Sequence, residues 1–140
     1  MKEPVIKGNT IIVPSSLEYL TNIDDFIEGI LRGFGTDDSA IADIAISVSE
    51  LVNNSVSHGN KASEDKTVSV SIDKKGSDVV IVIEDQGDGF DPEEISNPLD
   101  EANLLKDSGR GIFIVKSLMD SLEVNKTETG TSIIIKKAIA

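Results

Sequence analysis

The segment that decides the fold is the end of a helix, Ser49-Glu50-Leu51-Val52-Asn53-Asn54-Ser55-Val56-Ser57-His58-Gly59-Asn60. The apolar residues before and within it recur at helical spacing, and either Asp37 or Asp38 can cap the first turn. Gly59 is a natural stop for such a helix. Polar residues three or four positions apart form a stripe along it, which predicts an amphipathic helix: Asp43, Ser47, Glu50, Asn54 and His58.

An extended segment and a second amphipathic helix precede this one. Residues 5–13 contain two short extended pieces around Lys7-Gly8-Asn9. Ser15 and Glu18 then have the spacing of a capping box, and Gly33 ends the apolar periodicity that follows. The sequence therefore predicts two short strands and then a helix before residue 37.

A hairpin is predicted immediately after the central helix. Residues 67–73 alternate strictly between polar and apolar, which is typical of a strand with one buried face. The turn residues 74–77 lead into residues 79–83, an unbroken β-branched run that indicates a central strand. The short turn makes the pair antiparallel.

The remaining chain predicts a lid, a helix and a final hairpin. Residues 91–108 contain prolines and acids without periodicity, as long functional loops do. A helix is expected over 111–121, followed by strands over 122–125 and 130–137. We therefore expect one α+β domain over 1–140, a two-layer sandwich with helices on one face of a mostly antiparallel mixed sheet.

The composition restricts the possible functions. The 140 residues carry 25 acidic against 13 basic side chains, a formal net charge of -12. Such a field repels nucleic-acid phosphates and favours a basic protein partner, although it also serves solubility alone. There is no cysteine and no apolar run that spans a bilayer, and the first residues do not have the pattern of a secretory signal. These features favour a cytoplasmic protein without a membrane segment.

Glu50 and Asn54 are the first candidate site residues. They lie one helical turn apart, so their side chains leave the same face. A carboxylate can accept a proton from an attacking hydroxyl or water, and a carboxamide oxygen can bind Mg²⁺. A solvated helix face without function is the alternative, and for this pair alone it is the more common case.

Glycine-rich segments supply the other candidates. Asp85-Gln86-Gly87-Asp88-Gly89 follows the buried strand, where a carboxylate can accept a hydrogen bond from an exocyclic amine and glycines allow close approach to a base. Ser108-Gly109-Arg110-Gly111 opens a helix, whose free amides bind anions. Neither segment has the spacing of a P-loop or of a Rossmann site. A turn without function remains the alternative for each.

Two further residues are weaker candidates. Lys106 lies in the predicted lid and is able to reach a phosphate, although a solvated lysine is the more common case. His58 is the only histidine, and near a helix end its protonated form is stabilised by the helix dipole, which favours a capping role over catalysis.

The order and spacing of these motifs carry a resemblance that covers nearly the whole chain. Glu50-x-x-x-Asn54, Asp85-x-Gly87-x-Gly89, Gly109-x-Gly111 and then Gly130-Thr131 resemble the ATP-binding domain of the GHKL superfamily, shared by gyrase, histidine kinases and mismatch-repair ATPases. The small size, the short lid and the run from Ser49 to Gly59 are similar to the anti-sigma-factor serine kinases of bacteria.

This resemblance implies a role for each site residue. Glu50 would be the general base, and Asn54 would hold a Mg²⁺ ion that bridges the ATP phosphates. Asp85 would bind the adenine amino group. Further residues would line the base pocket or meet the phosphates under the lid: Gly87, Gly89 and Thr131 at the base, and Lys106, Gly109, Arg110 and Gly111 at the phosphates.

The resemblance also implies partners. A homodimer formed through residues 5–34 would hold a sigma factor and phosphorylate a serine of an anti-anti-sigma antagonist, which then loses affinity through the added charge. Two alternatives remain: an ATP-binding regulatory module that transfers nothing, and a histidine-kinase-type catalytic domain. The acid-rich lid, with few basic residues, is compatible with slow transfer or none.

Overall fold

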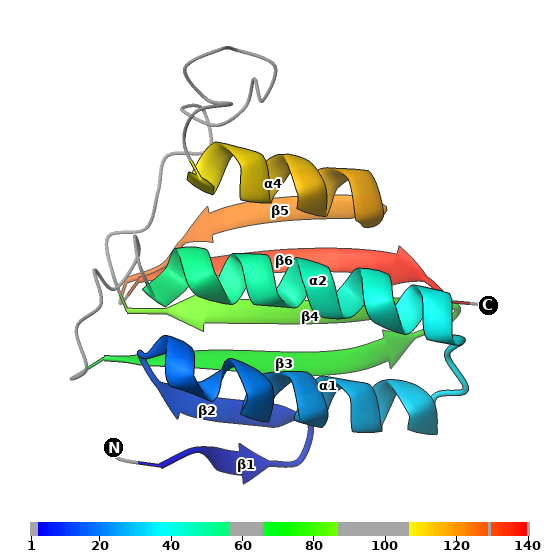
Figure 1. Ribbon diagram of the computed structural model, residues 1–140, viewed down its shortest axis with the longest axis horizontal. Coiled ribbons are helices and arrows are strands. Elements are labelled where there is room, and N and C mark those ends of the chain that lie inside the picture. The colour runs from blue at the N-terminus through cyan, green and yellow to red at the C-terminus, as the bar shows by residue number, and fades with distance from the viewer. Residues whose placement is uncertain (1–2, 57–65, 87–106, 129, 140) are drawn as a thin grey trace.

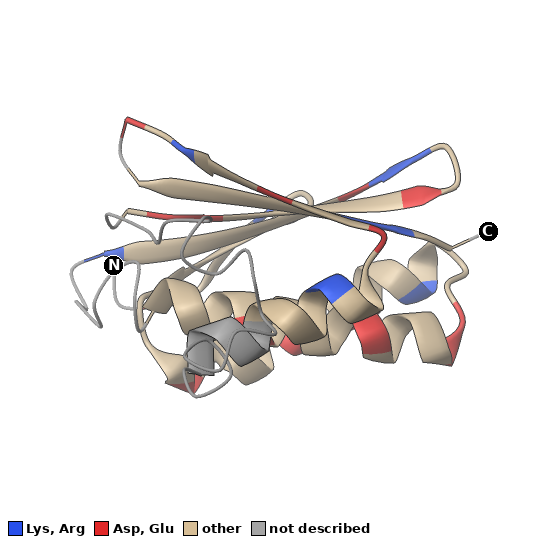
Figure 2. Cartoon of the chain, turned by 90° about the horizontal axis from the view of Figure 1, so that it is seen from above, with Lys and Arg blue, Asp and Glu red and all other residues tan. Residues whose placement is uncertain are grey.

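The computed structural model describes residues 3–56, 66–86, 107–128 and 130–139, with the backbone alone for 107–111. It consists of one six-stranded sheet covered on one face by helices (Figure 1). Seen from above, the sheet and the helices form two separate layers (Figure 2). The predicted two-layer α+β architecture is therefore confirmed.

The sheet has the strand order β1-β2-β3-β4-β6-β5. Its strands are β1 (Val5–Lys7), β2 (Thr10–Pro14), β3 (Thr67–Lys75), β4 (Asp78–Asp85), β5 (Ser121–Lys126) and β6 (Thr131–Ala138). Every pairing among them is antiparallel, which agrees with the expected mostly antiparallel sheet except that no parallel pair occurs among the described strands. Tight turns join most neighbours, and the β3–β4 turn uses Gly76 at a φ of 64°.

Helices α1 (Leu20–Gly33), α2 (Asp38–Asn54) and α4 (Asp107–Leu118) lie side by side on the sheet (Figure 1). Asp37 caps α2, as expected, through a hydrogen bond of 2.8 Å from the amide of Ala40 to its Oδ1. The expected cap at Ser15 is wrong. Ser15 is buried and its amide donates to the Lys66 carbonyl, so a 3-10 turn, η1 (Leu17–Tyr19), starts one residue later with Ser16 as its cap.

The third helix also differs from its predicted bounds. It begins at Asp107 rather than Gly111, and Ser121 belongs to β5. Burial of Ile112, Val115 and Met119 against the core outweighs the low helix propensity of the glycines in the first turn. The glycine-rich segment is therefore the first turn of α4 and not a loop in front of it.

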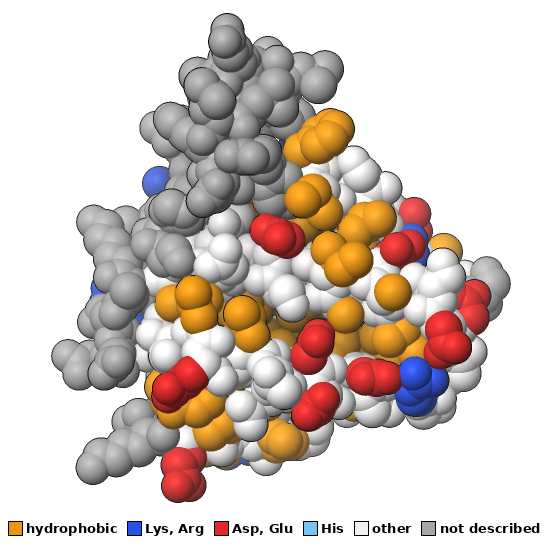
Figure 3. Space-filling view, viewed as in Figure 1, with side chains coloured by type: hydrophobic (Ala, Val, Ile, Leu, Met, Phe, Trp, Pro, Cys, Tyr) orange, Lys and Arg blue, Asp and Glu red, His pale blue; other side chains and the backbone are white. Residues whose placement is uncertain are grey.

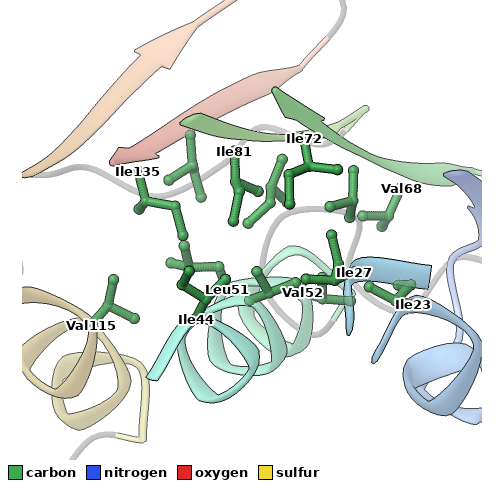
Figure 4. Packing of buried hydrophobic residues seen from close by; sticks show 14 of the residues in the cluster. Ile23, Ile27, Ile44, Leu51, Val52, Val68, Ile72, Ile81, Val115 and Ile135 are labelled. Atoms are coloured by element: carbon green, nitrogen blue, oxygen red, sulfur yellow. The ribbon is translucent and has the colours of Figure 1, made fainter. Parts of the chain in front are cut away.

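The core lies between the two layers. Side chains from β3, β4 and β6, such as Ile72, Ile81 and Ile135, point towards Ile44 and Leu51 of α2 (Figure 4). These residues are almost completely excluded from solvent, and each large side chain contributes about 1.5–3 kcal/mol of burial free energy. The alternation in β3 places its polar residues on the opposite face of the sheet, and no helix of the described residues covers that face.

Candidate functional site

The ends of two helices and two strands lie together at one edge of the molecule. α2 and β4 end there, whereas β6 and α4 begin there, at the left of Figure 1. This edge is called the site edge below. It brings together Asn54 at the end of α2, Asp85 at the end of β4, Thr131 at the start of β6 and the first turn of α4.

Asp85 and Thr131 are direct neighbours across the sheet. They are paired in the β4–β6 register, and both side chains belong to the face that the helices cover. Directly opposite side chains in an antiparallel pair lie about 4.5–5.5 Å apart at Cβ. Asp85 is only 5% exposed and Thr131 only 1%, so a carboxyl and a hydroxyl share one buried spot at the site edge.

Gly130 allows the backbone to come this close. A Cβ added at Gly130 would overlap the carbonyl oxygen of Asp85 and lie 2.6 Å from its carbonyl carbon. The turn holds the glycine in place, because its amide donates to Thr127 Oγ1 at 2.9 Å and its carbonyl accepts from the Thr127 amide at 2.8 Å. Only glycine fits against the end of β4 without displacing Asp85.

Gln86 closes the same edge on the other side. Its side-chain Oε1 accepts a hydrogen bond of 2.9 Å from the backbone amide of Thr67, at the start of β3. The residue after Asp85 is thereby fixed to the neighbouring strand. The structure thus holds the end of β4 from both sides, by β3 and by the turn before β6.

Buried polar groups without partners are concentrated at this edge. Four side-chain polar atoms in the described part of the chain are buried and make no hydrogen bond: Thr36 Oγ1, Asn54 Nδ2, Ser55 Oγ and Thr131 Oγ1. Three of them belong to the site edge, and Asn54 is 97% buried since only 3% is exposed. An unpaired buried polar group costs about 1–3 kcal/mol. Such groups are retained where a ligand completes their hydrogen bonds.

The polar stripe predicted on α2 is present from Asp43 to Asn54, whereas its last member, His58, lies outside the described residues; the stripe leads to the site edge. Asp43, Glu50 and Asn53 are half-buried, and Ser47 is fully buried with its hydroxyl donating to the Asp43 carbonyl at 2.9 Å. Glu50 lies one turn before Asn54 on this stripe. A carboxylate in that position remains accessible to solvent and to a second molecule.

The first turn of α4 completes the described part of the edge. Gly109, Arg110 and Gly111 lie in this turn, where the backbone amides have no partner within the helix. Such a turn attracts anions through its free amides and the helix dipole. The backbone placement therefore agrees with an anion site at the site edge.

Several predicted site residues lie outside the described residues. They are His58, Gly87, Gly89, Lys106 and the lid as far as residue 106. The predicted lid extended to residue 108, but Asp107 and Ser108 belong to the first turn of α4. Ser55 and Gln86 were missed by the sequence analysis, because no local pattern indicates that their side chains are buried or bonded at the edge. Thr131 entered only through the resemblance, and its register with Asp85 now gives the physical reason.

The donors at the edge fit a nucleotide better than a metal held by protein alone. No group of three or more His, Cys, Asp or Glu side chains able to hold a metal occurs in the described part. Mg²⁺ usually takes one or two protein ligands and completes its shell with phosphate oxygens and water. The Asn54 Oδ1 oxygen is a ligand of this kind, whereas the unpaired Asn54 Nδ2 is a hydrogen-bond donor that suits a phosphate oxygen. The described helices also include none long and apolar enough to cross a membrane.

Comparisons with known proteins agree with this geometry. Residues 13–137 match the family model of the histidine kinase-like ATPase domain. The chain is 32% identical to the serine-protein kinase RsbW of Staphylococcus aureus over 134 residues, covering 91% of this chain and 84% of the relative. It is 28% identical to RsbW of Oceanobacillus iheyensis over the same shares of both chains.

Two solved structures share the fold at 19% identity. One contains the RsbU and RsbW domains of Rv1364c from Mycobacterium tuberculosis, with a TM-score of 0.62 over 93% of this chain and 32% of that one. The other is the mycobacterial sensor histidine kinase MprB, with a TM-score of 0.57 over 91% of this chain and 95% of that one.

Proposed function

The chain belongs to the histidine kinase-like ATPase domain family, and we propose that it is an ATP-dependent protein serine kinase that acts as an anti-sigma factor. The observation that carries the proposal is the likeness to serine-protein kinases over nearly the whole chain. The unpaired Asn54 and Thr131 groups at the site edge support nucleotide binding at the place where the family motifs meet.

The proposed binding roles follow from the family motifs, and the positions of Asn54, Asp85 and Thr131 at the site edge support them. Asp85 accepts a hydrogen bond from the adenine amino group, and Thr131 donates or accepts one beside it. Gly87 and Gly89 line the base, whereas Gly109, Arg110, Gly111 and Lys106 meet the phosphates. Asn54 holds Mg²⁺, which when bound supplies positive charge against the phosphate oxygens. Such charge matters in a chain with a net charge of -12.

Glu50 is the proposed general base. Its carboxylate accepts the proton of the acceptor serine as the serine oxygen forms a bond to the γ-phosphorus of ATP. The bond between that phosphorus and the bridging oxygen breaks, and ADP leaves. A solvent-accessible position one turn before Asn54 allows a partner protein to bring its serine to this carboxylate.

The proposed partners are a sigma factor, an anti-anti-sigma antagonist and a second copy of the chain. The homodimer uses residues 5–34, where Ile6 is 60% and Leu17 45% exposed. Exposed Ile46, Phe113 and Ile114 add apolar surface to the helical layer, and Figure 3 shows apolar side chains gathered over α4 with acidic ones over α1 and α2. An acidic surface with apolar spots suits basic protein partners better than nucleic acid.

The test separates binding from transfer with one substitution. Glu50→Gln should retain the affinity for Mg-ATP in a calorimetric titration, while transfer of labelled γ-phosphate to an antagonist of the anti-anti-sigma class falls about 10²–10⁴-fold. Glu84→Gln is the matched control, because Glu84 is exposed and lies on β4 next to Asp85.

Each outcome of this test has one meaning. Full transfer by Glu50→Gln would remove Glu50 from the role of base. Binding of Mg-ATP by the wild-type chain without transfer to any serine would favour the regulatory module. An acid-labile product would favour transfer to histidine.

A further inference from the structure

A single lysine joins the far end of α4 to β6 and α2. Lys137 Nζ donates a hydrogen bond of 2.7 Å to the carbonyl oxygen of Leu118, the last residue of α4. The same Nζ lies 3.6 Å from Asp43 Oδ2 on α2, and the Lys137 side chain is only 19% exposed. Lys137 follows the buried Ile133 and Ile135 at alternate positions of β6, so it belongs to the face that the helices cover.

The chain around this lysine is fixed by further hydrogen bonds. The amide of Asp120 donates to the Lys136 carbonyl at 2.9 Å, and the amide of Ala138 donates to Asp120 Oδ2 at 2.7 Å. The last carbonyls of a helix have no partner within it, and a positive charge is favourable there. Lys137 supplies both a hydrogen-bond donor for a terminal carbonyl and a positive charge at the C-terminus of α4.

The two helices that Lys137 connects also form the site edge at their other ends. Asp43 lies on the polar stripe of α2 that leads to Glu50 and Asn54. The first turn of α4, with Gly109 and Gly111, faces the same edge. A link between α2 and α4 at one end therefore restrains their relative position at the other, since each helix moves as a nearly rigid rod.

We propose that Lys137 is a positioning residue for phosphoryl transfer: it fixes the phosphate-binding start of α4 relative to the base and the metal ligand on α2. This inference rests on the proposed function. Phosphoryl transfer depends mainly on positioning, and a displacement of about 1 Å far from the chemistry can cost about 10²-fold in rate. Lys137 itself contacts neither nucleotide nor protein substrate.

The test compares two adjacent lysines. Lys137→Met should lower kcat for transfer of the γ-phosphate from Mg-ATP to an antagonist of the anti-anti-sigma class about tenfold, while the Kd for Mg-ATP changes less than about threefold. Lys136→Met removes the same charge from an exposed neighbour on the opposite face of β6 and should leave both constants unchanged. Lys137→Arg retains the charge and the donors and should restore most of the rate. Equal kcat values for Lys137→Met and Lys136→Met would overturn the proposal.

A second readout does not require turnover. With Mg-ATP bound, amide hydrogen exchange in the first turn of α4 should be faster in Lys137→Met than in Lys136→Met, although that turn is far from the substitution. Exchange that rises only near residue 118 would mean that Lys137 has a merely local role. If wild-type chain binds no Mg-ATP at millimolar concentration, the proposed function fails and not this link alone.

A milder variant covers the case in which Lys137→Met does not fold. Asp43→Asn breaks only the ion pair at a half-exposed position and should lower kcat about twofold to threefold, with the Leu118 bond retained. In the Lys137→Arg background the same Asp43→Asn change should again slow turnover. No effect of Asp43→Asn in either background would remove α2 from the proposal.

Discussion

The two ends of the α2–α4 pair differ in whether their polar groups have partners. At the far end, Lys137 Nζ donates to the Leu118 carbonyl at 2.7 Å and lies 3.6 Å from Asp43 Oδ2, and Asp120 Oδ2 accepts from the Ala138 amide at 2.7 Å. At the site edge, Asn54 Nδ2, Ser55 Oγ and Thr131 Oγ1 are buried without a partner. The paired end stabilises the fold, whereas the unpaired end costs stability and, under the proposed function, has its groups available for the nucleotide.

The largest expected effect comes from the close backbone contact at the site edge. Gly130→Ala places a Cβ within the van der Waals radius of the Asp85 carbonyl. The added Cβ is attached directly to the backbone and the carbonyl is part of the backbone, so neither can rotate away as a flexible side chain would. We expect a loss of about 3 kcal/mol or more in the free energy of unfolding, measured by urea titration. Mg-ATP affinity should fall as well, because the end of β4 carries Asp85.

Gly29→Ala is the matched control for this substitution. Gly29 is exposed to solvent and lies away from the ends of α1, and an added Cβ meets nothing within 4 Å. Helix propensity predicts a gain of about 0.5–1 kcal/mol there. If Gly130→Ala were tolerated as well as Gly29→Ala, the close approach would not be what fixes the geometry of the site edge.

One substitution made at two threonines of the sheet tests the comparison most directly. The Thr131 hydroxyl has no partner, whereas Thr10 Oγ1 lies 2.8 Å from Ser71 Oγ in a hydrogen bond. Thr131→Val should therefore leave the free energy of unfolding unchanged or raise it by about 1 kcal/mol, and Thr10→Val should lower it by about 1 kcal/mol.

The effects on the affinity for Mg-ATP should be the reverse of those on stability, with the larger loss in the Thr131 variant. Thr131→Val removes a polar group from the proposed base pocket and should weaken Mg-ATP binding about fivefold in calorimetry, because one hydrogen bond is worth about 1 kcal/mol. Thr10→Val should leave the affinity unchanged. A large destabilisation by Thr131→Val would mean that this hydroxyl has a structural partner after all, and the contrast between the two ends would lose its support.

The strands and the helix cap that were predicted correctly have local sequence signals. The alternation of residues 67–73 identified β3, the β-branched run identified β4 as a central strand, and Asp37 was one of the two residues expected to cap α2. The errors came from tertiary contacts. Ser15 was expected to cap a helix but bonds Lys66 across the chain, and packing of Ile112 and Val115 draws the glycine-rich turn into α4.

The site edge was only partly predictable for the same reason. Asp85 and the Glu50–Asn54 pair have local signals, namely a strand end and a helical spacing. The fit of Gly130 against Asp85 joins residues far apart in sequence, and it depends on the β4–β6 register. A glycine before a threonine gives no local indication of that contact, so only the family resemblance pointed to this position.

Surface charge extends the comparison to α1 and gives the smallest expected effect. Arg32 pairs with Glu28 at 2.8 Å and with Asp38 at 3.1 Å near the far end, whereas Asp24 lies nearer the site edge beside Asp25 and Glu28. Partial burial, followed by repulsion from Asp25 and then Glu28, raises the pKa of Asp24 above its ordinary value of 3.8. Its charged form is therefore disfavoured in the folded state.

The sign of the pH dependence follows from that direction. A carboxyl whose pKa is raised by folding favours the folded state only while it is protonated, so it destabilises the fold as the pH rises through the shifted pKa. Asp24→Asn should thus stabilise the protein at pH 7.5, by less than about 1 kcal/mol because Asp24 is largely exposed, and the gain should vanish near pH 3. Urea midpoints at both pH values, at low and at high salt, measure this difference. A loss of stability at pH 7.5 would show that the Asp24 carboxylate interacts favourably, and that charge at this end of α1 is balanced as it is around Arg32.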